Sequence, residues 1–248
     1  MTKMIKMDLY RLFRSVSTWI ILFAIAALAF LSVVLVSMNT SIQSYSNAGE
    51  LLAAQINGGT LMTLCAIAVI LFVSTKYKNG FIKNIANQLS RRELLVFPEI
   101  IVSSVACALY FFAYSTCTIV AGAFIFGNTF ITFSFLDIIK LLIVQFVLHW
   151  SFCCLLLLFY MLTNSATVTM VIGLLISFKI LNVIYALVER FSHFNIGQYM
   201  LDANIFQLGM ASAKAVYIRA VVVGLIFLFV EIVLLCVVMH KKDIKLFS

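Results

Sequence analysis

Long apolar runs separated by short polar stretches dominate the chain. Six of these runs are long enough to cross the hydrocarbon core of a bilayer as a helix, which takes about 20 predominantly apolar residues. They cover residues 18–38, 58–75, 94–126, 138–162, 167–187 and 215–239. Only four residues link the fourth run to the fifth, so these two are expected to be antiparallel neighbours. The pattern predicts an all-α polytopic membrane protein with six transmembrane helices.

The first segment, residues 1–17, has a different pattern. Its apolar residues recur at helical spacing while four basic residues lie mostly elsewhere, which is typical of an amphipathic helix in a membrane interface. The apolar members are Ile5, Leu9, Leu12, Phe13 and Val16. We expect one domain over residues 1–248, made of this interfacial helix, six spans within 18–239 and a tail at 240–248.

Two further segments are neither spans nor simple loops. In the stretch between the second and third runs, Ile82, Ile85, Ala86 and Leu89 form one apolar stripe, which predicts a short amphipathic helix. This helix could press against lipid headgroups or against a cytoplasmic partner. Residues 188–214, between the fifth and sixth runs, are apolar but interrupted by Gly197 and Gly209, which predicts short re-entrant or interfacial helices.

The basic residues indicate the orientation. They concentrate in the N-terminal segment, in the loop after the second run and in the C-terminal tail, whereas the charged residues of segments 39–57 and 127–137 are Glu50 and Asp137. Loops rich in Lys and Arg stay on the cytoplasmic side. We therefore expect a multi-pass protein of the cell membrane with both termini in the cytoplasm.

Composition excludes several classes of protein. With 64% hydrophobic residues and a mean hydropathy of +1.14, the chain carries more apolar surface than a soluble fold can hide. The net charge of +8 does not indicate nucleic-acid binding, because the basic residues sit at the ends of apolar runs. The sequence has no P-loop, HExxH or GxSxG motif. We expect no catalytic, cofactor or metal site in this chain, and the six cysteines to pack as small hydrophobes.

Polar residues inside the predicted spans are the candidates for a translocation path, because an ionisable group in hydrocarbon is costly. Two interpretations stay open: a structural network between packed helices, or a polar lining for a path. The candidates are Gln145, His149, Lys179, Asn182 and Glu231.

Three stretches resemble one transporter family. They are KMDLYRLFRS at residues 6–15, YKNGFIKNI at 77–85 and SRRELL at 90–95. In these stretches and in its order of segments the chain resembles the permease subunit of ABC-2 type ATP-binding cassette exporters. The resemblance departs at Phe81, where the family usually has Thr, and at Lys76, where an acidic residue is common.

The resemblance implies partners and a mechanism. The loop between spans two and three would be the coupling helix, which docks a separate cytoplasmic ATPase subunit that binds ATP and Mg. A second permease copy or a paralogue would complete a dimer in the lipid bilayer. The coupling residues would be Asn79, Gly80, Phe81, Ile82, Lys83, Ile85, Leu89 and Arg91.

The substrate follows from the same resemblance. Compact six-span members of the family often export amphipathic peptides such as toxins and bacteriocins, including lantibiotics and phenol-soluble modulins, so a peptide substrate is expected. Exporters of small drugs or lipids share the plan. The alternative from another class is a membrane interaction or immunity protein that transports nothing. A secondary transporter is less favoured because the sequence shows no clear internal repeat.

Overall fold

The structure of the chain is a computed structural model that describes residues 2–38, 45, 47–78, 92–127, 134–192 and 194–241. Within these ranges all regular structure is helical, which confirms the all-α fold. The elements are α1 (Thr2–Arg14), α2 (Val16–Met38), α3 (Ala48–Ile56), α4 (Thr60–Lys78), η1 (Arg92–Leu95), α6 (Val96–Phe126), α7 (Phe135–Thr163), α8 (Ala166–Ser177), α9 (Ile180–Ser192), η3 (Gly197–Tyr199), α10 (Leu201–Gln207) and α11 (Lys214–Lys241).

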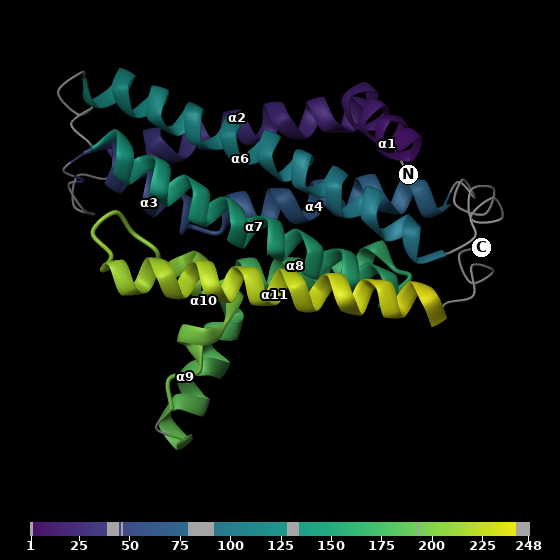
Figure 1. Cartoon of the computed structure of the whole chain (residues 1–248). Helices are drawn as coiled ribbons and strands as arrows, with labels where there is room; N and C mark the ends of the chain where they lie inside the picture. Colours follow the sequence, from purple (N-terminus) through teal and green to yellow (C-terminus); the bar gives the residue numbers. More distant parts are fainter. Residues whose placement is uncertain are drawn as a thin grey trace.

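Five of the described helices are long and apolar enough to cross a membrane, namely α2, α4, α6, α7 and α11. They lie along a common direction as a bundle (Figure 1). The fifth run of the sequence instead forms α8 and α9, which are bent by 59° at a short break. If that bent pair counts as one span, the described helices provide six.

Helix α7 lies at the centre of the bundle, where it packs against α4, α6, α8, α10 and α11. Leu148, Phe152 and Leu156, one helical turn apart from one another, are completely buried along it. The tight turn at Asn164 and Ser165 reverses the chain into α8, so the predicted antiparallel neighbours are confirmed. By contrast, α2 and α11 expose most of their apolar side chains, as a helix facing lipid would.

Helix α1 and the last turn of α11 lie at the same end of the bundle, called here the terminal end (Figure 1). Leu12 is buried while Tyr10 and Phe13 are exposed. The chain turns from α1 into α2 at Ser15, and the Trp19 indole N–H donates a hydrogen bond to the carbonyl of Phe13 at 2.8 Å across this corner. The predicted amphipathic helix is confirmed, although it ends three residues earlier than the pattern indicated.

Helix α3 was not predicted, because its nine residues are too few to span a membrane and it lies in a segment read as a loop. Its start is capped by Asn47, whose side-chain oxygen accepts a hydrogen bond from the Glu50 amide at 2.9 Å. Leu51, Leu52 and Ile56 are buried, and the helix packs against α6 and α4. The segment therefore belongs to the core.

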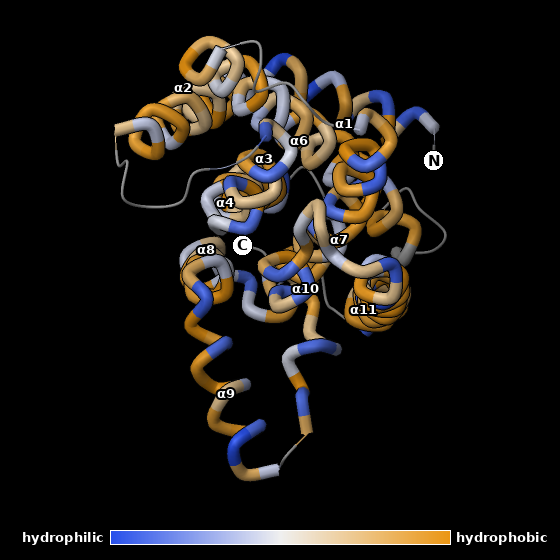
Figure 2. The backbone as a smooth tube through the Cα atoms, turned by 90° about the vertical axis from the view of Figure 1, so that its left-hand side faces the viewer, coloured by the Kyte–Doolittle hydropathy of each residue, from blue (hydrophilic) through white to orange (hydrophobic). Residues whose placement is uncertain are grey.

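The arm formed by α9 projects sideways from the bundle (Figures 1 and 2). None of its 13 residues, all of which are described, is buried. Two hydrogen bonds link α9 to the segment that follows it. The Tyr185 hydroxyl donates to the Asp202 carboxylate at 2.9 Å, and the Gly197 amide donates to the Glu189 carboxylate at 3.2 Å. Burial raises the pKa of the Asp202 carboxyl, and the Tyr185 hydrogen bond opposes part of that rise. Segment 188–214 contains the short helices η3 and α10, as its pattern indicated.

Replacing Gly59 with alanine should destabilise the fold strongly. Gly59 has a φ of +81°, and an added Cβ would overlap the carbonyl oxygen of Ser177 at the end of α8. Left-handed backbone and overpacking together should cost about 2–5 kcal/mol. The measurement is thermal unfolding of the purified protein in one detergent.

Gly127→Ala is the matched control. Gly127 has a nearly identical φ of +83°, but the described part of the chain places no atom within 4 Å of an added Cβ. Its ψ of 171° also favours glycine, so this variant should lose about 1–3 kcal/mol, the conformational part of the penalty. Equal losses for the two variants would contradict the close contact between Gly59 and α8.

Candidate functional site

A buried network of charges joins three helices at the terminal end of the bundle. The Lys76 ammonium of α4 lies 2.7 Å from a carboxylate oxygen of Asp8 in α1 and 3.4 Å from one of Glu99 in α6. The side chains of Lys76, Asp8 and Glu99 are at most 3% exposed. Arg11 adds a second cation 3.3 Å from Asp8. We call these four residues the charge network.

Local sequence explains how each helix brings its charge inward. Asp8 precedes the buried Leu12 by four residues and therefore shares its face of α1. Glu99 lies in the first turn of α6, beside Pro98, whose missing N–H is harmless at a helix start. Tyr77, next to Lys76, donates a hydrogen bond from its hydroxyl to Glu99 at 2.9 Å. The tyrosine ring packs edge-on against Tyr160 of α7.

Among the described residues the network is balanced in charge, with two cations and two carboxylates. A buried ion without a partner costs several kcal/mol, so each member depends on the others remaining in place. Replacing all members of a buried ion-pair group with apolar residues can leave the stability of a protein unchanged. Such pairs therefore specify one arrangement of the helices more than they add stability. Here the specified arrangement is the docking of α1 onto α4 and α6.

The network lies at the base of the basic segment between α4 and α6. Lys76 and Tyr77 are within the last turn of α4 before it, and Glu99 is in the first turn of α6 after η1. The eight residues predicted to couple to an ATPase, from Asn79 to Arg91, lie outside the described residues. The structure describes the residues that flank this segment: Lys76 before it bonds to Asp8 of α1, and Glu99 after it bonds to Lys76.

Asp8 and Glu99 were not among the residues predicted to be functional. The sequence did contain a sign that Asp8 is buried. It is the single acid of α1 and falls within the apolar stripe of that helix, between Ile5 and Leu12. Lys76, where the resembled family often has an acid, is explained by its two carboxylate partners. Neither a known protein family nor a curated protein matches this chain.

Two of the predicted path residues, Gln145 and His149, lie together on α7 and are completely buried. A ring nitrogen of His149 is 2.8 Å from the Gln145 carbonyl, and its ring packs against Phe111 of α6. Gln145 donates hydrogen bonds to the Asn57 side chain at 3.2 Å and to the Ile205 carbonyl at 3.0 Å. It therefore links α7 to the turn after α3 and to α10.

This linkage is part of a junction where two helix breaks meet. Asn57 and Gly59 form the break between α3 and α4, and Gly59 packs against the end of α8. Lys179, at the break between α8 and α9, has a φ of 60° and its ammonium lies 4.7 Å from the centre of the Phe206 ring of α10. The exposed Lys179 is thus held by a cation–π contact. Asn182, one turn further along α9, is partly buried, and its side-chain oxygen has no hydrogen-bond partner among the described residues.

The fifth candidate, Glu231 of α11, is not close to the histidine. The Ser151 hydroxyl of α7 donates to one of its oxygens at 3.2 Å, and the other oxygen has no hydrogen-bond partner in the described part of the chain. Ser151 lies two residues after His149, on a different side of α7, because successive helical residues are about 100° apart. The structure brings Gln145 and His149 together and leaves Glu231 on another face. Their role in a path stays a prediction.

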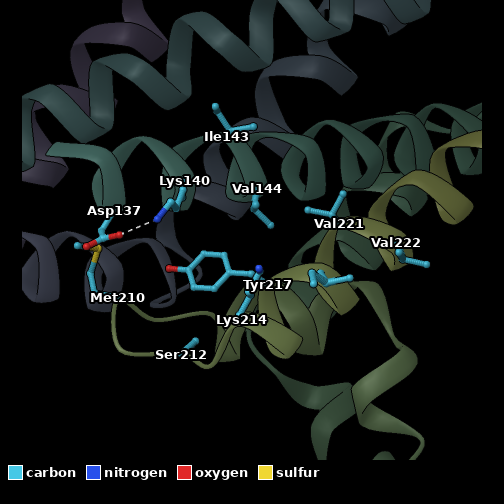
Figure 3. Close-up of a pocket in the computed structure, with 11 residues that line it drawn as sticks. Asp137, Lys140, Ile143, Val144, Met210, Ser212, Lys214, Tyr217, Val221 and Val222 are labelled. Atoms are coloured by element: carbon cyan, nitrogen blue, oxygen red, sulfur yellow. Dashed lines mark hydrogen bonds and ion pairs between the residues drawn. The ribbon is translucent and has the colours of Figure 1, made fainter. Parts of the chain in front are cut away.

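A groove of about 590 Å³ lies between the N-terminal ends of α7 and α11 and is called here the α7–α11 groove (Figure 3). Asp137 and Lys140, which bond to each other at 3.0 Å, lie with Lys214 near its rim, whereas residues such as Val144 and Val221 supply apolar walls. It lies at the end of the bundle opposite the charge network. Among the described residues no cluster of histidine, cysteine and acidic side chains could hold a metal ion.

Lys76→Met should be strongly destabilising, because Glu99 would lose its cation and Asp8 would retain only Arg11. Breaking a buried pair in this way costs about 3–5 kcal/mol. The triple variant Asp8→Asn, Lys76→Met, Glu99→Gln should recover much of the loss. Thermal unfolding in detergent measures all of these changes.

The control is Lys140→Met, which removes a lysine of an ion pair whose side chains are 66% and 48% exposed. An exposed pair contributes about 0–1 kcal/mol, so this variant should unfold close to wild type. If Lys76→Met behaved in the same way, the charge network would not hold the three helices together.

Gln145→Leu tests the structural interpretation of this residue. Leucine has a similar shape but leaves the Asn57 oxygen and the Ile205 carbonyl without their donor, which should cost about 1–3 kcal/mol. Gln207→Leu, at an exposed position of α10, is the matched control and should change stability by less than about 0.5 kcal/mol. Unchanged stability in Gln145→Leu would contradict the structural role.

Proposed function

We propose that this chain is the membrane-spanning permease subunit of an ATP-driven exporter of the ABC-2 type. A separate cytoplasmic ATPase subunit would bind the basic segment between α4 and α6 and carry out ATP hydrolysis. The chain would lie in the cell membrane with both termini in the cytoplasm, so that the terminal end of the bundle faces the ATPase. The resemblance at residues 6–15, 77–85 and 90–95 is the first support for this proposal.

The charge network is the observation that carries the proposal. A subunit driven from outside must transmit a displacement of its docking segment to several helices at once. Lys76 and Tyr77 before the segment and Glu99 after it are bonded to each other and, through Lys76, to α1. A push on the segment would therefore move α1, α4 and α6 together. Buried charge pairs suit this task because separating them is costly.

A route for substrate would lie between two chains. Gln145 and His149 are sealed inside the described bundle, so one chain alone presents no open polar route at these residues. A second copy or a paralogue would supply the other wall. The α7–α11 groove, with apolar walls and charges near its rim, is complementary to an amphipathic helix, which favours a peptide substrate over a small polar one.

A second candidate is a membrane interaction or immunity protein that transports nothing. The arm formed by α9 favours it, because Val183, Leu187 and Phe191 expose apolar surface on a helix that projects from the bundle. Such a face could hold a protein partner within the membrane. ATP-dependent export of peptide from vesicles that contain the chain and its copurified ATPase distinguishes the two candidates.

Replacing Ile85 and Leu89 with aspartate should abolish binding of the ATPase, because both residues lie on the apolar stripe of the predicted coupling helix. A buried charge in a docking surface costs several kcal/mol, so at least a hundred-fold weaker binding is expected. The measurement is mild detergent extraction from the native membrane, followed by mass spectrometry of the proteins that copurify.

The matched control is Asn84→Asp with Asn87→Asp, which adds the same two charges off the stripe. It should retain the ATPase. Normal copurification with the Ile85 and Leu89 variant would contradict the coupling role. A wild-type chain that stays folded and brings down no protein with a P-loop would favour the interaction protein instead.

A further inference from the structure

A second pocket at the terminal end combines one arginine of the charge network with a second arginine that the proposed export does not use. It occupies about 410 Å³ between the end of α1 and the last turns of α4. We call it the arginine pocket and define it by Tyr10, Arg11, Arg14, Ser15, Phe72 and Thr75. Two guanidinium groups and three hydroxyls thus surround one space, and no acidic side chain of the described residues lines it.

Aromatic contacts hold both guanidinium groups at the pocket. The Arg11 guanidinium lies 5.3 Å from the centre of the Phe72 ring, which belongs to α4. Arg14 donates a hydrogen bond to the Tyr10 hydroxyl at 2.8 Å, and its guanidinium lies 5.8 Å from the centre of the Tyr10 ring. Arg14, which forms no ion pair with a described carboxylate, can direct the rest of its planar fork to a phosphate, a group that a guanidinium binds with two parallel hydrogen bonds.

Among the described residues, Arg11 has a carboxylate partner in Asp8, whereas Arg14 has none. Asp8, the single acid of α1, is buried on the inner face and bonds to Lys76 at 2.7 Å. Glu99 is also buried within the charge network. The charged side chains that α1 exposes are therefore basic, with Lys3, Lys6 and Arg14 on its surface and Arg11 partly exposed. The outer surface of this helix attracts anions.

One apolar side chain of α4 extends the pocket by a helical turn. Leu71 precedes Thr75 by one helical turn, on the same face, and is 39% exposed. A ligand that fits both features has an anionic phosphate at one end and a hydrocarbon chain at the other. We propose that the arginine pocket binds the phosphate of an anionic phospholipid, with the acyl chain along α4. The site requires only that α1 lies in a membrane interface, so it does not depend on export.

The site is connected to the charge network. Arg11 lines the pocket and also lies 3.3 Å from Asp8, so a phosphate bound there contacts the cation that supports the Asp8 carboxylate. The docking of α1 onto α4 then depends on the lipid. Anionic lipid should therefore raise the thermal stability of the whole chain, and the arginine variants should lose this response.

The experiment presents the full-length chain in mild detergent with equal amounts of phosphatidylglycerol and phosphatidylcholine and counts retained lipids by native mass spectrometry. Arg14→Gln should reduce retained phosphatidylglycerol about five-fold, and Arg11→Gln with Arg14→Gln about thirty-fold. Arg14 is exposed, so its replacement should leave the fold intact. Lys6→Gln, which removes one exposed charge from the same helix outside the pocket, should retain the lipid as wild type does.

Three results would overturn the proposal. One is equal retention of phosphatidylglycerol by wild type and the double arginine variant. Another is an equal loss in Lys6→Gln, which would indicate attraction to the general charge of α1. A third arm adds inorganic phosphate to the chain in phosphatidylcholine nanodiscs. If phosphate alone stabilised the wild type as phosphatidylglycerol does, the pocket would be a free-anion site and the lipid assignment would be wrong.

Discussion

Lys76 lies between two buried carboxylates, and the arrangement of the terminal end of the bundle depends on it. Asp8 and Glu99 repel each other, and neither could stay buried and ionised without a cation between them. Because the two acids belong to α1 and α6, the lysine also decides where α1 docks. An amphipathic helix without such a bond could slide along a membrane interface. The ion pair gives it one position.

The same principle applies inside the bundle, where polar groups are placed at breaks in the helices. Gln145 donates hydrogen bonds to the Asn57 side chain and to the Ile205 carbonyl. It thereby satisfies acceptors close to the points where the helices are interrupted. Lys179, at another break, contacts the ring of Phe206. Irregular backbone at membrane depth is tolerated only when it is packed in protein, and α7 supplies that packing.

Charges on the outer surface have a different role. Arg14 lies on the exposed side of α1, whereas Asp8 on the inner side is bonded within the protein. One helix therefore presents a basic face to its surroundings and an acidic contact to the core. This division would allow α1 to respond to lipid through the proposed site at the arginine pocket and to the proposed ATPase through the segment between Lys76 and Glu99. The proposed exporter would use both contacts.

The sequence by itself determined the all-helical class, the apolar runs and the amphipathic α1, because helix formation depends on length and periodicity along one chain. It also indicated that Gln145, His149 and Glu231 lie within helices. Only the tertiary structure decided that Asp8, Lys76 and Glu99 meet, that Glu231 lies apart from His149, and that the fifth run breaks at Lys179. These features arise from contacts between helices, and a periodic pattern does not specify which helices are neighbours. Helix α3 was not predicted for the same reason. Its nine residues form a buried helix through their packing against α4 and α6.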